Sequence, residues 1–448
     1  MNLIDRSHIS KAICIVINHI YDKEHLKETK LLKLLLLFGT CKELRDRIYN
    51  IKHFTIYDWY FTENIDYRTA LRFENPFRKQ PYSKCNASIQ SFIKFLNKLT
   101  LLTTLDASGT TDIYEILEHT TLTNLTKLTL KETEHNSPEK NTQHKQIGYI
   151  ISSFPKITTL DFSHHYYIAN AVVFCLPNLL HLRTLNLSFC ILEECAKNLK
   201  DIFKLLTQLN YLDISHHNVK FTASYYNNEC IVDILSAITS LVSLETLVYE
   251  LNNIVKISDA LAFCMCLNAL TKLKTLSLRQ THINIDCMHI LAENLDKQIT
   301  LENLNLSKLE FYSKVKPRET LSFSLREKDK ITFGEKQSFF PNETFILWTR
   351  ILKKMSNLTH LNLEDNDLTL NDITALITAF NNLTKLQKLN LSSNSIDVDS
   401  LPLLAQLIKH LPKLRVLNLY NNYFQQKDET EWMQFIEPRI NLEYEKSS

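Results

Sequence analysis

The sequence predicts an α/β solenoid, or horseshoe, with parallel strands on the concave face and helices on the convex face, preceded by a small helical N-terminal domain. Two observations support this fold class. The pattern LxxLxL recurs in order along most of the chain, and most copies follow one another at a nearly constant interval. A unit of about 25 residues has room for one strand and one helix, and it buries its leucines only by stacking against its neighbours.

Eleven copies of the pattern are present. The most regular are LTHLNLEDNDL, LQKLNLSSNSI and LRVLNLYNNYF, which begin at equal intervals at Leu358, Leu386 and Leu414. The other copies begin at Leu102, Leu125, Ile157, Leu182, Leu209, Leu244, Leu273 and Leu301. We therefore expect eleven short strands in a row.

The residue type at each position of the repeat has a physical reason. Alternate strand residues point to opposite faces, so Leu361 and Leu363 enter the core while Asn362 faces outward. A polar residue then closes the strand, because its side chain can satisfy backbone groups of the turn. This slot holds Asn366, Asn394 and Asn422 in the regular copies. In earlier copies it holds Thr110, Thr133, His165, Cys190, His217, Asn252 and Thr281.

Amphipathic stretches lie between the strands. In NDITALITAFNNLTK, Ile373, Leu376 and Phe380 mark one helical face, and Asn371 or Asp372 is expected to cap the helix. The whole pattern resembles the leucine-rich repeat family, in the long-repeat class typified by cytosolic ribonuclease inhibitor. The resemblance covers residues 99–425 and implies a surface that recognises another protein.

Residues 311–345 interrupt the period, because the copies at Leu301 and Leu358 stand two units apart rather than one. The segment is either a degraded repeat around TLSFSLREKDKITF or an inserted loop. Residues 311–336 carry seven Lys and Arg against four Asp and Glu. Such an insertion is either a solvated charged loop or a binding element.

Residues 1–98 are expected to form the helical N-terminal domain, and residues 426–448 a C-terminal cap and tail. The fragment LLKLLLLFGTCKELRDRI loosely resembles the middle of an F-box, with Leu35, Cys41 and Leu44 at docking positions. An F-box would imply a substrate adaptor of a cullin-type ubiquitin ligase that docks on a Skp-type adaptor. The alternative is a helical cap, since the open end of a solenoid needs a cover.

Composition excludes several classes of function. The four glycines, Gly39, Gly109, Gly148 and Gly334, are scattered singly, whereas phosphate-binding loops need clustered glycines. We expect no cofactor and no enzymatic activity. With 51 Lys and Arg against 49 Asp and Glu, the charge is too balanced for nucleic-acid binding.

The ten cysteines are scattered without repeated Cys-x-x-Cys pairs, which is typical of reduced thiols. The early apolar run at positions 12–17 is too short for a secretory signal, and no window reaches the roughly 18 apolar residues of a membrane span. We predict a cytoplasmic monomer without membrane association.

The doubled histidines could suggest a metal site. His164-His165 and His216-His217 occupy equivalent places two repeats apart, with Cys190 between them. Their strands should lie roughly 10 Å apart, which is too far for one zinc ion unless the intervening repeat contributes a ligand. Turn residues in place of asparagine are the simpler interpretation, and we predict no metal.

The outward strand residues are the main candidates for function. One column runs through Asp106, Thr129, Asp161, Asn186, Asp213, Val248, Ser277, Asn305, Asn362, Asn390 and Asn418, and a second contains Lys131, Glu250, Arg279, Glu364 and Tyr420. Such columns form a broad rigid surface suited to a protein partner. The residues expected to bind it are Tyr211, Glu250, Arg279, Asn305, Asn362, Glu364, Asn390, Asn418 and Tyr420.

The richness in Ile, Lys and Asn and the tail EYEKSS resemble leucine-rich repeat proteins that intracellular bacteria inject into host cells. This resemblance implies a non-catalytic effector that binds a host protein in the host-cell cytosol. Two alternatives stay open. One is the F-box-like adaptor, and the other is a GTPase-activating regulator for which Arg279 is the nominal catalytic candidate.

Overall fold

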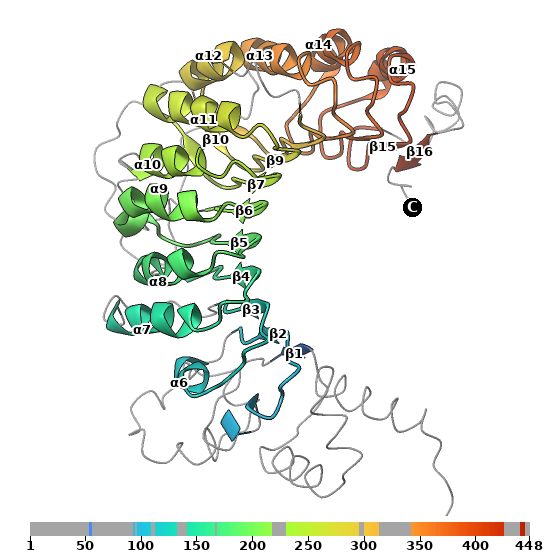
Figure 1. Cartoon of the computed structure of the whole chain (residues 1–448). Helices are drawn as coiled ribbons and strands as arrows, with labels where there is room; N and C mark the ends of the chain where they lie inside the picture. Colours follow the sequence, from blue (N-terminus) through green and yellow to red (C-terminus); the bar gives the residue numbers. More distant parts are fainter. Residues whose placement is uncertain are drawn as a thin grey trace, which may run out of the picture. The chain divides into compact units, whose positions relative to one another are not determined.

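The computed structural model describes residues 53–55, 93–94, 96–108, 113–131, 141–165, 168–216, 230–294, 300–312, 342–424 and 440–443 (Figure 1). The chain divides into two compact units, residues 1–125 and residues 126–448. In the first unit, β1 (His53–Thr55) pairs in parallel with β2 (Thr104–Asp106), and α6 (Ile113–Glu118) follows. The sequence pattern does not predict β1, because residues 53–55 belong to no copy of LxxLxL.

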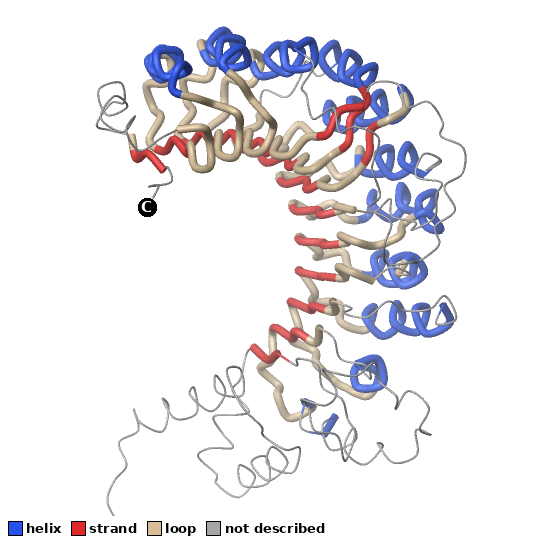
Figure 2. Tube along the Cα trace, turned by 180° about the vertical axis from the view of Figure 1, so that it is seen from behind, coloured by secondary structure: helices blue, strands red, loops and turns tan. Residues whose placement is uncertain are grey.

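The second unit contains a long parallel sheet whose strands follow one another along the chain. These strands are β3 (Lys127–Thr129), β4 (Thr159–Asp161), β5 (Thr184–Asn186), β6 (Tyr211–Asp213), β7 (Thr246–Val248), β9 (Thr275–Ser277), β11 (Asn303–Asn305), β13 (His360–Asn362), β14 (Lys388–Asn390), β15 (Val416–Asn418) and β16 (Asn441–Glu443). Within this unit the strands lie on the inner side of a curve (Figure 2). The predicted solenoid with a concave parallel sheet is therefore confirmed.

The strands stay in register because a leucine stands at the centre of each repeat strand. Leu361 pairs with Leu389, and Leu389 pairs with Leu417. The central leucines are at most 3% exposed from β3 to β15. Leu358 and Leu363, on either side of β13, are also buried, as predicted. Stacking of these side chains forms the continuous core that no single repeat could form alone.

Helices cover the outer side of the second unit (Figures 1 and 2). They are α7 (Asn141–Ser152), α8 (Ala169–Cys175), α9 (Ala196–Leu205), α10 (Cys230–Ile238), α11 (Ile257–Ala269), α12 (Ile285–Asn294), α13 (Asn342–Leu352), α14 (Leu370–Phe380) and α15 (Leu401–Lys409), with short 3₁₀ turns η3 (Leu176–Asn178), η4 (Glu193–Cys195) and η5 (Val398–Ser400).

The start of α14 differs from the prediction. The N-cap residue is Thr369 rather than Asn371 or Asp372. Asp372 is the third residue of the helix, and its carboxylate accepts hydrogen bonds from the Thr369 backbone N–H at 2.8 Å and hydroxyl at 2.7 Å. The helix begins earlier because a Thr-x-x-Asp pair satisfies its first N–H groups from both sides.

The irregular segment adds no described strand to the main sheet. β11 pairs directly with β13, with Leu304 opposite Leu361. β12 (Glu310–Tyr312) instead joins β10 (His282–Asn284) and β8 (Asn253–Ile254) in a second parallel sheet, and α13 begins at Asn342. This pairing leaves no place for a further strand between β11 and β13, and residues 313–341 lie outside the described residues.

Candidate binding surface on the concave face

A polar side chain holds the turn after most strands of the second unit. The buried Asn394 shows the full arrangement. Its side-chain oxygen accepts hydrogen bonds from the backbone N–H groups of Asn366 at 2.9 Å and Leu368 at 3.0 Å. Its amide nitrogen lies 3.0 Å from the carbonyl oxygen of Leu363, in the preceding repeat, and donates to it. One side chain thus joins two consecutive turns.

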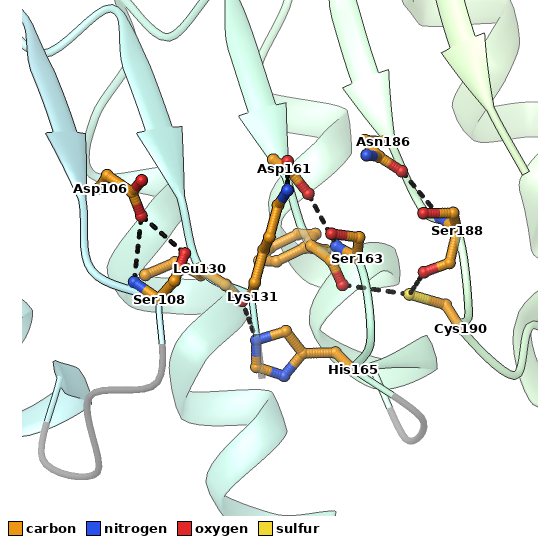
Figure 3. Close-up of polar contacts among 11 residues, drawn as sticks. Asp106, Ser108, Leu130, Lys131, Asp161, Ser163, His165, Asn186, Ser188 and Cys190 are labelled. Atoms are coloured by element: carbon orange, nitrogen blue, oxygen red, sulfur yellow. Dashed lines mark hydrogen bonds and ion pairs between the residues drawn. The ribbon is translucent and has the colours of Figure 1, made fainter. Parts of the chain in front are cut away.

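Other residues at this slot also donate to a carbonyl of the preceding repeat, as the sequence predicts for turn residues. The pairs are His165 with Leu130 (Figure 3), Cys190 with Phe162, Asn252 with Ile214, Thr281 with Tyr249, Asn366 with Leu306, and Asn422 with Leu391. Thr110, Thr133 and His217 lie outside the described residues. The repeat of β11 places Leu309 in the slot, and the Leu309 N–H donates to Asn366. We call this series the turn ladder.

The residue before each ladder slot adopts the left-handed conformation, with φ between 53° and 67°. These residues are His164, Phe189, His216, Leu251, Gln280, Lys308, Asp365, Ser393 and Asn421. Asn, Asp and His tolerate this conformation, whereas bulky residues such as Phe189 and Leu251 rarely adopt it. The hydrogen bonds of the ladder hold the turn, and residues of different types therefore adopt the left-handed conformation before the slot.

Side chains of this left-handed column contact one another from repeat to repeat. The rings of His164 and Phe189 stack with centroids 4.3 Å apart, and those of Phe189 and His216 are also 4.3 Å apart. In the later repeats, Lys308 and Asp365 form an ion pair at 2.9 Å. The chemistry of the column therefore differs along the unit: it is aromatic at His164, Phe189 and His216, and charged at Lys308 and Asp365.

The predicted Asp and Asn column has a structural task as well as an outward position. In most repeats its side-chain oxygen accepts the backbone N–H of the second residue after it, at 2.9 to 3.1 Å (Figure 3). The residues concerned in the second unit are Asp161, Asn186, Asp213, Asn305, Asn362, Asn390 and Asn418, and all are half-buried. In the first unit Asp106 makes the same contact with Ser108. Thr129 and Ser277, which were expected to face outward, are buried. Ser277 is buried together with its hydroxyl, which donates a hydrogen bond to the Glu250 carboxylate.

The middle repeats carry a cluster of acidic and aromatic groups. We define the central patch as Asp161, His164, Phe189, Tyr211, Asp213, His216 and Glu250. Burial, together with the charges of Glu250 and Asp161, raises the pKa of Asp213. Burial and the same kind of acidic surroundings raise the pKa of Tyr211 to about 12. The charges of Asp161, Asp213 and Glu250 therefore all act on the Tyr211 phenol.

The histidines of the central patch are biased toward the neutral form. Burial and, secondarily, the charge of Lys131 lower the pKa of His164. Burial and then His164 lower the pKa of His216. At neutral pH both rings are therefore uncharged, and the row presents aromatic faces rather than two cations.

The predicted contact residues fall into separate groups. Tyr211 and Glu250 belong to the central patch, and Arg279 is exposed one repeat beyond Glu250. Glu364 accepts a hydrogen bond of 3.4 Å from Asn390, and Tyr420 is 48% exposed. These last residues lie in the repeats of β13 to β15. Leu35, Cys41 and Leu44 lie outside the described residues.

Sequence reasoning missed the contribution of Phe189 and of the left-handed column. The signal was present, because each of these residues directly precedes a ladder slot. It is visible only after the copies are aligned on that slot, since His164, Phe189 and His216 stand in three different repeats. His164 and His216 were considered as metal ligands, whereas the structure places an aromatic ring between them.

Within the described residues there is no group of three or more His, Cys, Asp or Glu side chains arranged to hold a metal ion. His165 and Cys190 donate to backbone carbonyls instead. No helix in the described ranges is long and apolar enough to cross a membrane.

Residues 385–407 match the family model described as Leucine Rich Repeat. The fold is a leucine-rich repeat solenoid. A solved structure of an internalin from Listeria monocytogenes is 18% identical and covers 80% of this chain and 77% of its own, with a TM-score of 0.42. No curated protein matches the chain.

Proposed function

We propose that this protein is a non-catalytic scaffold that binds a partner protein through the concave face of its second unit. The observation that carries the proposal is the strict register of the strands, which sets outward side chains in columns on a backbone held by the turn ladder. Such a surface loses little conformational freedom on binding, so more of the contact energy appears as affinity.

The test compares two sets of variants of the full chain as bait in lysates. The concave set is Tyr211→Ala, Arg279→Ala and Tyr420→Ala. The matched convex set is Ile257→Ala, Leu261→Ala and Met265→Ala, which removes exposed side chains from α11. We expect the concave set to lose a partner that the convex set retains. Loss on the convex set alone would place binding on the helices and contradict the proposal.

The finer proposal is that the partner is a host protein and that the chain is a bacterial effector. It rests on the composition and tail noted in the sequence. Capture of the same partner from host-cell lysate, and of none from bacterial lysate, is the expected result. A partner found only in the bacterial lysate would reject the effector role while leaving the scaffold function intact.

The N-terminal fragment LLKLLLLFGTCKELRDRI supports a second candidate, the F-box-like adaptor. Copurification with a Skp-type protein should disappear in Leu35→Asp or Leu44→Asp and persist in the concave set. Absence of any Skp-type protein from the wild-type complex would reject this candidate. Arg279 is exposed among other outward residues, and nothing in the described part of the chain favours the GTPase-activating alternative.

A further inference from the structure

The central patch combines an aromatic row with negative charge. His164, Phe189 and His216 form the row, with centroids 4.3 Å apart at each step. Asp161 and Asp213 stand at the ends of β4 and β6, in the repeats of the first and third rings. Tyr211 lies on β6 in the same acidic surroundings. Rings and carboxylates therefore occupy three consecutive repeats on one face.

The negative charge of the patch is only partly compensated within the described residues. Lys131 lies 3.5 Å from Asp161, but its side chain is 46% exposed. Asp213 and Glu250 have no cationic partner in the described ranges, and Glu250 is held by a 2.5 Å hydrogen bond from Ser277. A half-buried carboxylate without a cation is unfavourable, and a ligand cation would relieve that cost.

One buried hydroxyl also remains without a partner at this place. Ser163 is 2% exposed, and its backbone N–H donates to Asp161 at 2.9 Å, which sets the residue beside that carboxylate (Figure 3). Its Oγ makes no hydrogen bond among the described residues. The equivalent serines Ser307 and Ser392 use this hydroxyl to bond their own Asn. The first repeat of the patch therefore has a buried hydroxyl, Ser163 Oγ, without a hydrogen bond among the described residues.

We propose that the central patch binds an arginine side chain of the partner protein, with the guanidinium paired with Asp213 and stacked on His216, the end ring of the aromatic row in the same repeat. Arginine fits better than lysine because its planar, weakly hydrated fork can stack on a ring and bond a carboxylate at the same time. A bare divalent ion fits less well, since the described residues offer no cluster of ligands for one. The inference rests on the proposed function and names the anchor of the partner.

The experiment uses three peptides and the full chain. The probes are acetyl-Gly-Arg-Gly-amide, the same peptide with citrulline, which is planar but neutral, and the same peptide with lysine. Binding is followed by the ¹³Cε1 NMR signals of His164 and His216, each assigned by its His→Asn variant. The arginine peptide should shift both signals, and the other two peptides should bind at least about fivefold more weakly.

Two variants test the site while keeping the local structure: Asp213→Asn removes the pairing carboxylate, and Phe189→Asn removes the ring that packs against His216. Asp213→Asn retains the acceptor for the Ser215 N–H, as Asn186 and Asn390 do in their repeats. Phe189→Asn keeps a residue type that the same column uses at Asn421. We expect Asp213→Asn to weaken binding of the arginine peptide about tenfold and Phe189→Asn about threefold. The controls are Asp365→Asn and Gln280→Asn, which change residues of the same column outside the patch and should bind normally, and melting temperatures verify folding.

Several results would overturn the inference. Equal shifts by the citrulline or lysine peptide would exclude a specific guanidinium site, and unchanged binding by Asp213→Asn would exclude the pairing. Capture of the partner from lysate tests this inference and the proposed function separately. If Asp213→Asn and Phe189→Asn keep a partner that Arg279→Ala and Tyr420→Ala lose, the scaffold function stands and the arginine anchor falls.

Discussion

Loss of a single side chain of the turn ladder should lower the unfolding free energy by several hydrogen bonds' worth, and Asn394→Ala tests this. Asn394 is 6% exposed. Its loss leaves the backbone N–H groups of Asn366 and Leu368 without their acceptor and removes the donor to the Leu363 carbonyl. Each buried N–H left unpaired costs about 1–3 kcal/mol, so we expect a loss of about 3–5 kcal/mol in unfolding free energy.

The comparison is Thr281→Val, which occupies the same slot. Thr281 donates only its hydroxyl, at 3.0 Å to the Tyr249 carbonyl, and valine fills the same volume. The expected loss is about 1 kcal/mol. Asn371→Ala is the control, because this residue is exposed on α14 and the change should stay within about 0.5 kcal/mol.

Urea unfolding followed by circular dichroism gives the three free energies, provided that the m-values agree. Asn394→Ala should lower the unfolding free energy at least twice as much as Thr281→Val does. If both cost the same, the two accepted N–H bonds add nothing, and the turn must be held by its leucines alone.

Three further predictions concern packing, thiols and charge. Gly148→Ala should lower the unfolding free energy by about 1–3 kcal/mol, as measured by urea unfolding. The reason is that the new Cβ would lie 2.7 Å from Phe174 Cβ and 2.9 Å from a backbone oxygen of α8. An unchanged free energy would show that α7 and α8 can separate freely. Peptide mapping after alkylation of the native chain should find no label on thiols whose pKa burial raises to about 12, and full label in urea. These thiols are Cys195, Cys264 and Cys287. Asp213→Asn should stabilise the chain at pH 7, since the raised pKa means that ionised Asp213 is disfavoured in the folded state; the gain should vanish as pH falls below 3.8, where the folded and unfolded states are both protonated. Equal gains at both pH values would show that charge is not the cause.

The regular part of the fold is predictable because its forces are local and repeated. Leu361, Leu389 and Leu417 recur at one interval, and stacking is the only way to bury them together. The ladder slot is also readable when it holds His165 or Cys190, since position rather than residue type defines it.

The remaining features could not be read in this way. β1, β8 and β16 belong to no copy of LxxLxL, and they form because a neighbouring strand offers unpaired backbone groups. The central patch depends on which side chains meet across repeats of unequal length. Tyr211 and Glu250 were identified as single candidates, whereas their connection through Asp213 required the folded register.

Each C-terminal repeat presents the same leucine and the same asparagine amide to the repeat before it and to the repeat after it. Their interfaces are therefore interchangeable, and whole repeats could be gained or lost without any new fit between neighbours. Evolution can in this way adjust the span of the array independently of the chemistry displayed on it.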